Sequence, residues 1–204
     1  MIFITGPHNV GKSTLANWLA QRSFIAVETG DIVRQKHQEL APDVSFYDWA
    51  SAVNEEDPDF LNKCVLEEVQ KRATEVQESA GLLQDVVVVG NRQYSGIEFL
   101  ANSVEQSDKK SVIISIKASS DELYRRHFQR DDHRMPDITP EQFEEYLDYD
   151  KRMGLDEIEG HADIKIESGN IEETRREVVE ELQKYGYKAE ENMEVNIETS
   201  RRIY

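Results

Sequence analysis

Residues 6–14 read Gly-Pro-His-Asn-Val-Gly-Lys-Ser-Thr, and this stretch decides the fold of the 204-residue chain. It matches G-x-x-x-x-G-K-S, the P-loop pattern, in which backbone N–H groups surround phosphate oxygens. The apolar run 1–5 before it predicts a buried strand, and the apolar spacing after it predicts a helix over 11–22. Strand, loop and helix together indicate a binding site for a nucleoside triphosphate with Mg²⁺.

Each residue type in the loop has a physical role. Gly6 and Gly11 allow backbone torsions that a Cβ atom would penalise. Lys12 is positioned to reach the β- and γ-phosphates, and the Ser13 hydroxyl to ligate Mg²⁺. His8 is either a ligand contact or a residue that fills the loop. The candidate ATP-binding residues are Gly6, His8, Asn9, Val10, Gly11, Lys12, Ser13 and Thr14.

Composition restricts the partners of the chain. With 24 basic and 41 acidic residues, its formal net charge is −17, which repels nucleic-acid phosphates and disfavours DNA or RNA as a partner. No apolar run has the length of a membrane span. Because the first predicted strand begins at residue 1, we expect no signal peptide. Cys64, the single cysteine, is expected as a buried thiol. We expect a cytoplasmic protein, a monomer or homodimer, whose partners are small nucleotides.

Strands and helices are predicted to alternate along the chain. Further strands are predicted at 24–27, 86–89, 111–117 and 162–166. Helices are predicted at 31–40, 45–53, 58–79, 94–105, 119–130, 140–153 and 170–185. This order favours βαβ crossovers, and hence a three-layer α/β fold with a five-stranded parallel sheet and helices on both faces. We assign residues 1–186 to one core and 187–204 to a C-terminal extension that carries no motif.

Polar residues follow two of the predicted strands. Asp31 and Arg34 follow strand 24–27, and Arg92 follows the Val-rich strand 86–89. Because ligands bind at the carboxyl ends of parallel strands, two arginines near the P-loop predict a second anion. The alternatives are that Arg34 is a solvated helix residue and that Asp31 caps its helix.

Three arginines recur at four-residue spacing at positions 126, 130 and 134. Arg126 and Arg130 share a helix face, where like charges repel without a counter-anion. One interpretation is pairing with nearby carboxylates such as Asp131 and Asp132. The other is a lid over about 126–153, in which Arg126, Arg130 and Arg134 close over the triphosphate.

The motifs Gly6 to Ser13, Gly30-Asp31-x-x-Arg34, Gly90-x-Arg92 and Arg126-x-x-x-Arg130 occur in this order. Together they resemble the nucleoside monophosphate kinase superfamily. The chain looks most similar to the archaeal adenylate-kinase-like and dephospho-CoA-kinase-like members. The resemblance extends over about residues 1–185. This resemblance rests further on Arg130-Asp131-Asp132, Phe143-Glu144-Glu145 and Ala162-Asp163.

The resemblance implies roles for these residues. Arg34 and Arg92 would hold the phosphate of an acceptor, within an acceptor-binding helical region at about 30–80. Lys12 and the three arginines would be catalytic: Arg126 would approach the base or phosphates of ATP, Arg130 the transferred phosphoryl group, and Arg134 would come from the lid. The expected cofactors are ATP and Mg²⁺.

The chain departs from the superfamily pattern at three positions. Val89 stands where a carboxylate helps to organise Mg²⁺, and Tyr146 where the lid carries a second arginine. Gly96 replaces the Gln that reads the acceptor base, which leaves Gln93 and Tyr94 as candidates for that contact. The aromatic pair Tyr47 and Trp49 is expected either to stack on a base or to pack internally.

These features predict an ATP-dependent phosphotransferase acting on a small phosphorylated acceptor, foremost a (deoxy)nucleoside monophosphate. Alternatives in the same class are a dephospho-CoA kinase and a kinase of a modified nucleotide. An alternative of another class is a nucleotide-binding ATPase or regulatory protein with weak turnover. A regulatory GTPase is disfavoured because Asn62-Lys63 is followed by Cys64-Val65 and not by the x-Asp of a base-reading motif.

Overall fold

The computed structural model describes residues 1–81, 84–103, 109–129 and 138–189 and has an α/β architecture. Its five strands form one parallel sheet, as the sequence predicted, and the structure gives their order as β2-β3-β1-β4-β5. The strands are β1 (Ile2–Thr5), β2 (Phe24–Glu28), β3 (Asp85–Val89), β4 (Val112–Lys117) and β5 (Ile164–Glu167). Since β1 pairs with β3 and β4, the P-loop at its carboxyl end lies at the middle of the sheet.

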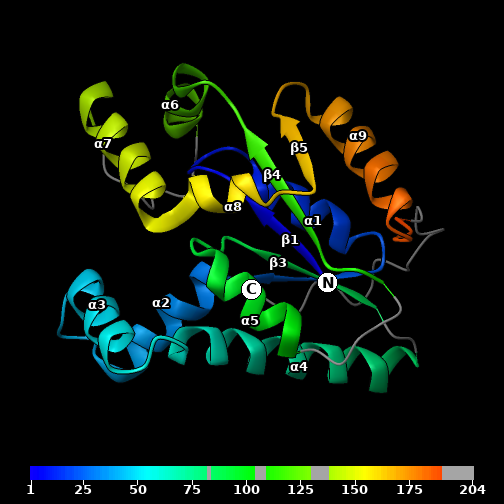
Figure 1. Ribbon diagram of the computed structural model, residues 1–204, viewed down its shortest axis with the longest axis horizontal. Coiled ribbons are helices and arrows are strands. Elements are labelled where there is room, and N and C mark those ends of the chain that lie inside the picture. Colours follow the sequence, from blue (N-terminus) through cyan, green and yellow to red (C-terminus); the bar gives the residue numbers. More distant parts are fainter. Residues whose placement is uncertain (82–83, 104–108, 130–137, 190–204) are drawn as a thin grey trace.

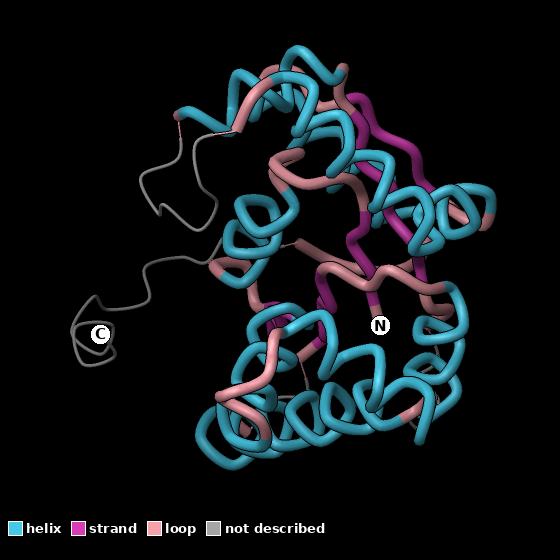
Figure 2. The backbone as a smooth tube through the Cα atoms, turned by 90° about the vertical axis from the view of Figure 1, so that its left-hand side faces the viewer, coloured by secondary structure: helices cyan, strands magenta, loops and turns pink. Residues whose placement is uncertain are grey.

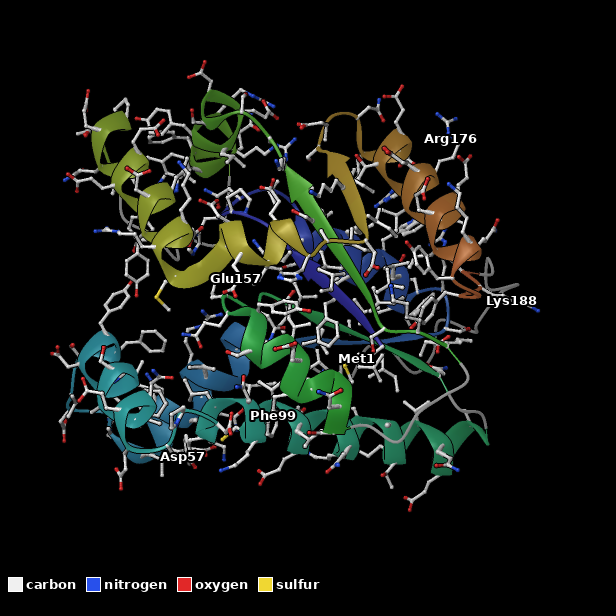
Figure 3. All side chains as sticks on the ribbon, viewed as in Figure 1. Met1, Asp57, Phe99, Glu157, Arg176 and Lys188 are labelled. Atoms are coloured by element: carbon white, nitrogen blue, oxygen red, sulfur yellow. The ribbon has the colours of Figure 1, made fainter. Side chains whose placement is uncertain are left out.

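Helices enclose the sheet (Figures 1 and 2). They are α1 (Lys12–Ala20), α2 (Thr29–Leu40), α3 (Phe46–Glu56), α4 (Phe60–Ala80), α5 (Tyr94–Ser103), α6 (Ser120–Phe128), α7 (Pro140–Asp150), α8 (Asp156–Gly160) and α9 (Ile171–Lys184). One buried cluster joins the sheet to α1, α6, α7 and α9, and a second joins it to α2, α4, α5 and α8. Figure 3 shows the side chains that fill the space on both sides of the sheet.

The Val-rich strand β3 explains why both faces of the sheet are covered. Val87 and Val89 belong to the first cluster, whereas Val86 and Val88 belong to the second. A strand buried on both faces needs apolar side chains at every position, and the continuous valine run supplies them. Cys64 is also buried, as expected.

The end of α7 differs from the prediction. The predicted helix 140–153 ends at Asp150, and a π-helical turn over Lys151–Leu155 follows. Gly154 adopts φ 113 in that turn, after which the short helix α8 resumes. The sequence does not predict α8, because a glycine directly after a predicted helix is typical of a helix end.

Asp31 and Tyr187 are placed differently from what the sequence suggested. Asp31 does not cap α2, because that helix begins earlier, after Glu28, and Asp31 lies in its first turn beside Arg34. Tyr187 follows the predicted core and is fully buried in the first cluster. Within the described residues, no helix combines the length and apolar character needed to cross a membrane.

Candidate nucleotide and acceptor site

The P-loop connects β1 to α1 with a backbone that requires glycine. Gly6 and Gly11 adopt φ 143 and 101, in the region that side chains disfavour. A Cβ atom on Gly6 would also collide with the carbonyl oxygen of Ile116 on β4. The loop can therefore take this course between two strands only because position 6 has no side chain.

The charged head of Lys12 lies inside the loop. Its Nζ donates hydrogen bonds to the carbonyl oxygens of Gly6 (2.9 Å) and Pro7 (2.7 Å). Gly11 precedes α1, and no side chain caps the helix. The first N–H groups of α1 and the positive end of its dipole therefore face the same space as the lysine, which is the geometry of a phosphate site.

Arg126 of α6 lies against the other side of the loop. Its Nη1 donates to the Val10 carbonyl (3.1 Å) and to Ser168 Oγ (2.9 Å), and its Nε donates to Glu122 (2.7 Å). Hydrogen bonds from Arg125 and Arg126 lower the pKa of Glu122 to about 2. Arg126 is thus fixed beside the P-loop, whereas Arg130 and Arg134 lie outside the described residues.

Asp150, at the end of α7, connects the P-loop to the segment after β3. Its carboxylate is almost fully buried, with 1% of the residue exposed. Oδ2 accepts hydrogen bonds from the His8 backbone N–H (3.0 Å) and from His8 Nδ1 (2.7 Å). Oδ1 lies 2.9 Å from Arg92 Nη1. Three segments that are far apart in the sequence therefore meet at one carboxylate.

The charges of this cluster follow from its contacts. Burial opposes ionisation of Asp150, but the hydrogen bonds from His8 and the charge of Arg92 outweigh it and hold the pKa of Asp150 below its ordinary value. Burial lowers the pKa of His8, and the charges of Arg92 and Lys12 add to this, against the raising effect of Asp150. At neutral pH the cluster therefore holds an ionised Asp150, a neutral His8 and a charged Arg92.

A cleft of about 1180 Å³ extends from the P-loop across the sheet edge to α2, α3 and α4. Most of the predicted site residues line it together: His8, Asn9, Val10, Gly11, Lys12, Ser13, Thr14, Arg34, Arg92, Gln93 and Arg126. Gly6 and Asp31 lie beside it, and Asp31 forms an exposed ion pair with Arg34. With this volume the cleft leaves room for a second ligand next to a nucleotide, and its lining includes residues of the helical region predicted for the acceptor.

Glu28 stands beside Val89, the position that lacks the expected carboxylate. The two residues are partners in the register of β2 and β3. Glu28 Oε1 and Asn91 Oδ1 are buried oxygens without a hydrogen-bond partner among the described residues, and both residues line the cleft with Ser13. Oxygen donors of this kind suit Mg²⁺, so these three residues fit the metal that a P-loop requires. Among the described residues, no group of three or more His, Cys, Asp or Glu side chains is arranged so that it could hold a metal ion by itself.

Aromatic side chains gather around the part of the cleft next to His8 and α3. Tyr146 packs edge-on against His8, with ring centroids 5.6 Å apart. A hydrogen bond with Tyr146 raises the pKa of Tyr47 to about 12, and Tyr47 is half exposed in the cleft. Trp49 is buried between His37 and Phe46, so for this residue the packing interpretation is confirmed.

Asp150, Asn62 and Glu28 are cleft residues that sequence reasoning missed. Asp150 stands in the charged run 148–152, where it reads as one more surface residue. Asn62 lies on α4, with its side chain against Gly96. The absence of a side chain at Gly96 was a signal that another residue occupies the space, but the sequence does not tell which one.

One protein family and several solved structures are similar to this chain. A family model described as an AAA domain matches residues 2–148. A comparison with curated protein sequences found no match.

Three solved structures have a similar fold. TT1252 from Thermus thermophilus has a TM-score of 0.54 at 17% identity, over 90% of this chain and 95% of its own. A gluconokinase from Sinorhizobium meliloti 1021 has the same TM-score and identity, over 90% and 91% of the two chains. An uncharacterized protein from Eubacterium ventriosum ATCC 27560 also gives 0.54, at 13% identity over 90% and 97%. At these identities the similarity shows the fold alone.

Proposed function

Because the chain belongs to the AAA domain family, we propose that it is an ATP-dependent phosphotransferase that moves the γ-phosphoryl group of ATP to a small phosphorylated acceptor. The P-loop of such a domain implies nucleotide binding. The observation that carries the rest of the proposal is the position of Arg92. Its Nη2 is 3.4 Å from the ring nitrogens of His8, so a second cationic group stands next to the loop that receives the triphosphate.

The proposal assigns the donor half of the cleft to ATP. Lys12 neutralises the β- and γ-phosphates, and Arg126 stabilises charge on the phosphoryl group during transfer. Arg130 and Arg134 are proposed to join it from the lid. Ser13 would hold Mg²⁺ together with Glu28 and Asn91, and the bound ion would neutralise phosphate charge. Exclusion of water from this half strengthens each of these interactions.

The acceptor half lies between Arg92 and α2–α4. Arg92 and Arg34 hold the acceptor's phosphate, because the planar guanidinium group binds phosphate oxygens in pairs. Asp31 positions Arg34 through their ion pair. Gln93 and Asn62 are two of the amide side chains that line the cleft, and we assign them to the contact with a base. A (deoxy)nucleoside monophosphate satisfies these contacts.

A second candidate acceptor is dephospho-CoA or a modified nucleotide. One specific observation favours it: His8 and Asp150 form a hydrogen-bonded pair at the junction of the two halves. Such a pair is of use when the attacking group is a hydroxyl that must lose its proton. A nucleotide-binding ATPase with weak turnover is the remaining alternative, since Val89 replaces a carboxylate.

The test is Mg²⁺-dependent ADP release with a panel of nucleoside monophosphates and dephospho-CoA. We expect one acceptor to stimulate ADP release far above the acceptor-free rate. Lys12→Ala should abolish the activity, and Arg92→Ala should raise the acceptor KM and lower kcat. The control is Lys71→Ala, which removes a cation from the exposed face of α4. Full activity of Lys12→Ala, or equally slow turnover with every acceptor, would contradict the proposal.

A further inference from the structure

The His8 ring is held in one orientation by two contacts with Asp150. The same carboxylate oxygen accepts from the backbone N–H of His8 (3.0 Å) and from its Nδ1 (2.7 Å). An ionised carboxylate can only accept hydrogen bonds, so Nδ1 carries the proton. In a neutral imidazole the other nitrogen, Nε2, then holds a lone pair. The pairing thus fixes which nitrogen of His8 can take up a proton.

Arg92 lies next to this ring, at a long hydrogen-bonding distance from both of its nitrogens. One nitrogen of Arg92 is 3.4 Å from both His8 Nδ1 and His8 Nε2. A donor aligned with the Nε2 lone pair would be much closer to Nε2 than to Nδ1, so this guanidinium group approaches between the two nitrogens. A third of the His8 side chain is exposed, and the residue lines the cleft.

The location of His8 puts this lone pair near the proposed sites of both substrates. His8 lies within the P-loop, two residues after Gly6, whose carbonyl binds Lys12 Nζ. It also lies beside Arg92, which is assigned above to the acceptor's phosphate. A group at Nε2 is therefore at the junction of the donor and acceptor halves, where the attacking atom of the acceptor must pass.

From these contacts, and resting on the proposed function, we propose that His8 is the general base for a hydroxyl acceptor and that Asp150 is its positioning residue. The acceptor would be a phosphorylated molecule that is held through its phosphate by Arg92 and attacks through a free hydroxyl. A phosphate oxygen acceptor has little need of a base, since its second ionisation has a pKa near 6.

The step balances without a further reactant. The hydroxyl oxygen forms a bond to the γ-phosphorus, and the bond from that phosphorus to the β,γ-bridging oxygen breaks, with its electron pair leaving on ADP. The hydroxyl proton moves to His8 Nε2. The resulting imidazolium is paired with the Asp150 carboxylate, and the proton is then released to water.

The decisive measurement is the phosphorus NMR spectrum of the product. Wild-type protein, ATP and Mg²⁺ are incubated with nucleoside monophosphates and with dephospho-CoA, which offers both a ribose hydroxyl and phosphate groups. Transfer to a hydroxyl gives a phosphate monoester signal, whereas transfer to a phosphate gives a coupled phosphoanhydride signal. A new phosphoanhydride would overturn this inference while leaving the proposed kinase intact. Absence of any phosphorylated product would overturn both.

Two variants test the base itself. His8→Asn keeps a donor near the position of Nδ1 for Asp150 but has no lone pair in place of Nε2. We expect kcat to fall by about 10²–10⁴-fold with ATP affinity unchanged, since that is the usual contribution of a general base. Asp150→Asn should also lower kcat, because it no longer fixes the tautomer. Thermal melting of both variants establishes that they fold.

The pH profile separates a base from a structural histidine. The charged and titratable groups that face His8 are Asp150 and Tyr146 from α7, Arg92 after β3, and Lys12. Wild-type kcat should fall at acidic pH as His8 becomes protonated, and this limb should disappear in His8→Asn. An unchanged acidic limb in that variant, or a kcat within threefold of wild type, would overturn the assignment.

Discussion

Gly96 of α5 leaves room for the side chain of Asn62 on α4: a Cβ atom at position 96 would lie 2.7 Å from Asn62 Oδ1. The missing side chain at one position thus places an amide group from another helix along the cleft. An amide from α4 therefore lies beside the position at which the resemblance led us to expect a Gln.

The first prediction concerns this pair. Gly96→Ala should raise the acceptor KM several-fold, because the methyl group displaces the Asn62 amide. Its effect on stability should be small: crowding costs about 1–3 kcal/mol, and replacing glycine inside a helix returns about 1 kcal/mol. Steady-state kinetics and chemical denaturation measure the two effects. The double variant Gly96→Ala/Asn62→Ala should be no worse than Asn62→Ala alone, and independent additive losses would contradict the coupling.

The second prediction concerns the metal. Glu28→Gln should raise the Mg²⁺ concentration needed for half-maximal ATP turnover several-fold, because it removes the carboxylate charge beside Val89. ATP affinity in EDTA should stay the same, since the P-loop contacts are intact. Glu55→Gln, at an exposed position of α3, is the matched control. Identical Mg²⁺ titrations for the two variants would rule out a role for Glu28 at the metal.

The third prediction is a pH dependence at Tyr47. Its pKa is raised from the ordinary 10.0 to about 12, chiefly by the hydrogen bond with Tyr146. The folded state therefore holds this proton more tightly than the unfolded chain, so the contribution to stability is complete below pH 10 and is lost as pH rises to about 12.

Tyr47→Phe isolates that contribution. The difference in unfolding free energy between wild type and this variant should shrink between pH 10 and 12. The tyrosinate absorbance of wild type should include a phenol that ionises near pH 12, and this component should be missing from Tyr47→Phe. A constant stability difference across the window would show that the phenol is not held in this way.

The fourth prediction concerns Tyr187, whose buried hydroxyl contacts the carbonyl oxygens of Lys110 (2.9 Å) and Met1 (3.1 Å). Tyr187→Phe should lower the free energy of unfolding by about 1–3 kcal/mol, because buried polar groups lose their partner. Urea denaturation measures this loss. Tyr185→Phe, at a partly buried position nearby, should lose less. Equal losses of unfolding free energy in the two variants would show that the contacts of the Tyr187 hydroxyl have no special effect.

The parts of the site that the sequence predicted depend on local pattern and on sheet geometry. The P-loop is a contiguous motif, and the valine run marks β3 because a strand buried on both faces needs apolar residues throughout. Arg92 could be expected near the loop because parallel strands end at the same edge. These arguments need no knowledge of side-chain packing.

What escaped prediction depends on contacts between distant segments. Asp150 acts through His8, 142 residues away, and a charged residue in a charged run gives no sign of burial. Glu28 lies beside Val89 only through the register of two strands. The Asn62 amide reaches the cleft because of a space left on a different helix. Each of these three contacts can be found only from the three-dimensional structure.

The bond from the His8 backbone N–H to Asp150 has a consequence for how the protein opens. A main-chain amide proton in the first loop is shielded from solvent by a carboxylate at the end of α7. Its exchange with deuterium therefore requires α7 to move away from the P-loop, without any unfolding of the sheet. The exchange rate of this single amide, compared with amides in β1, would report how often α7 separates from the P-loop.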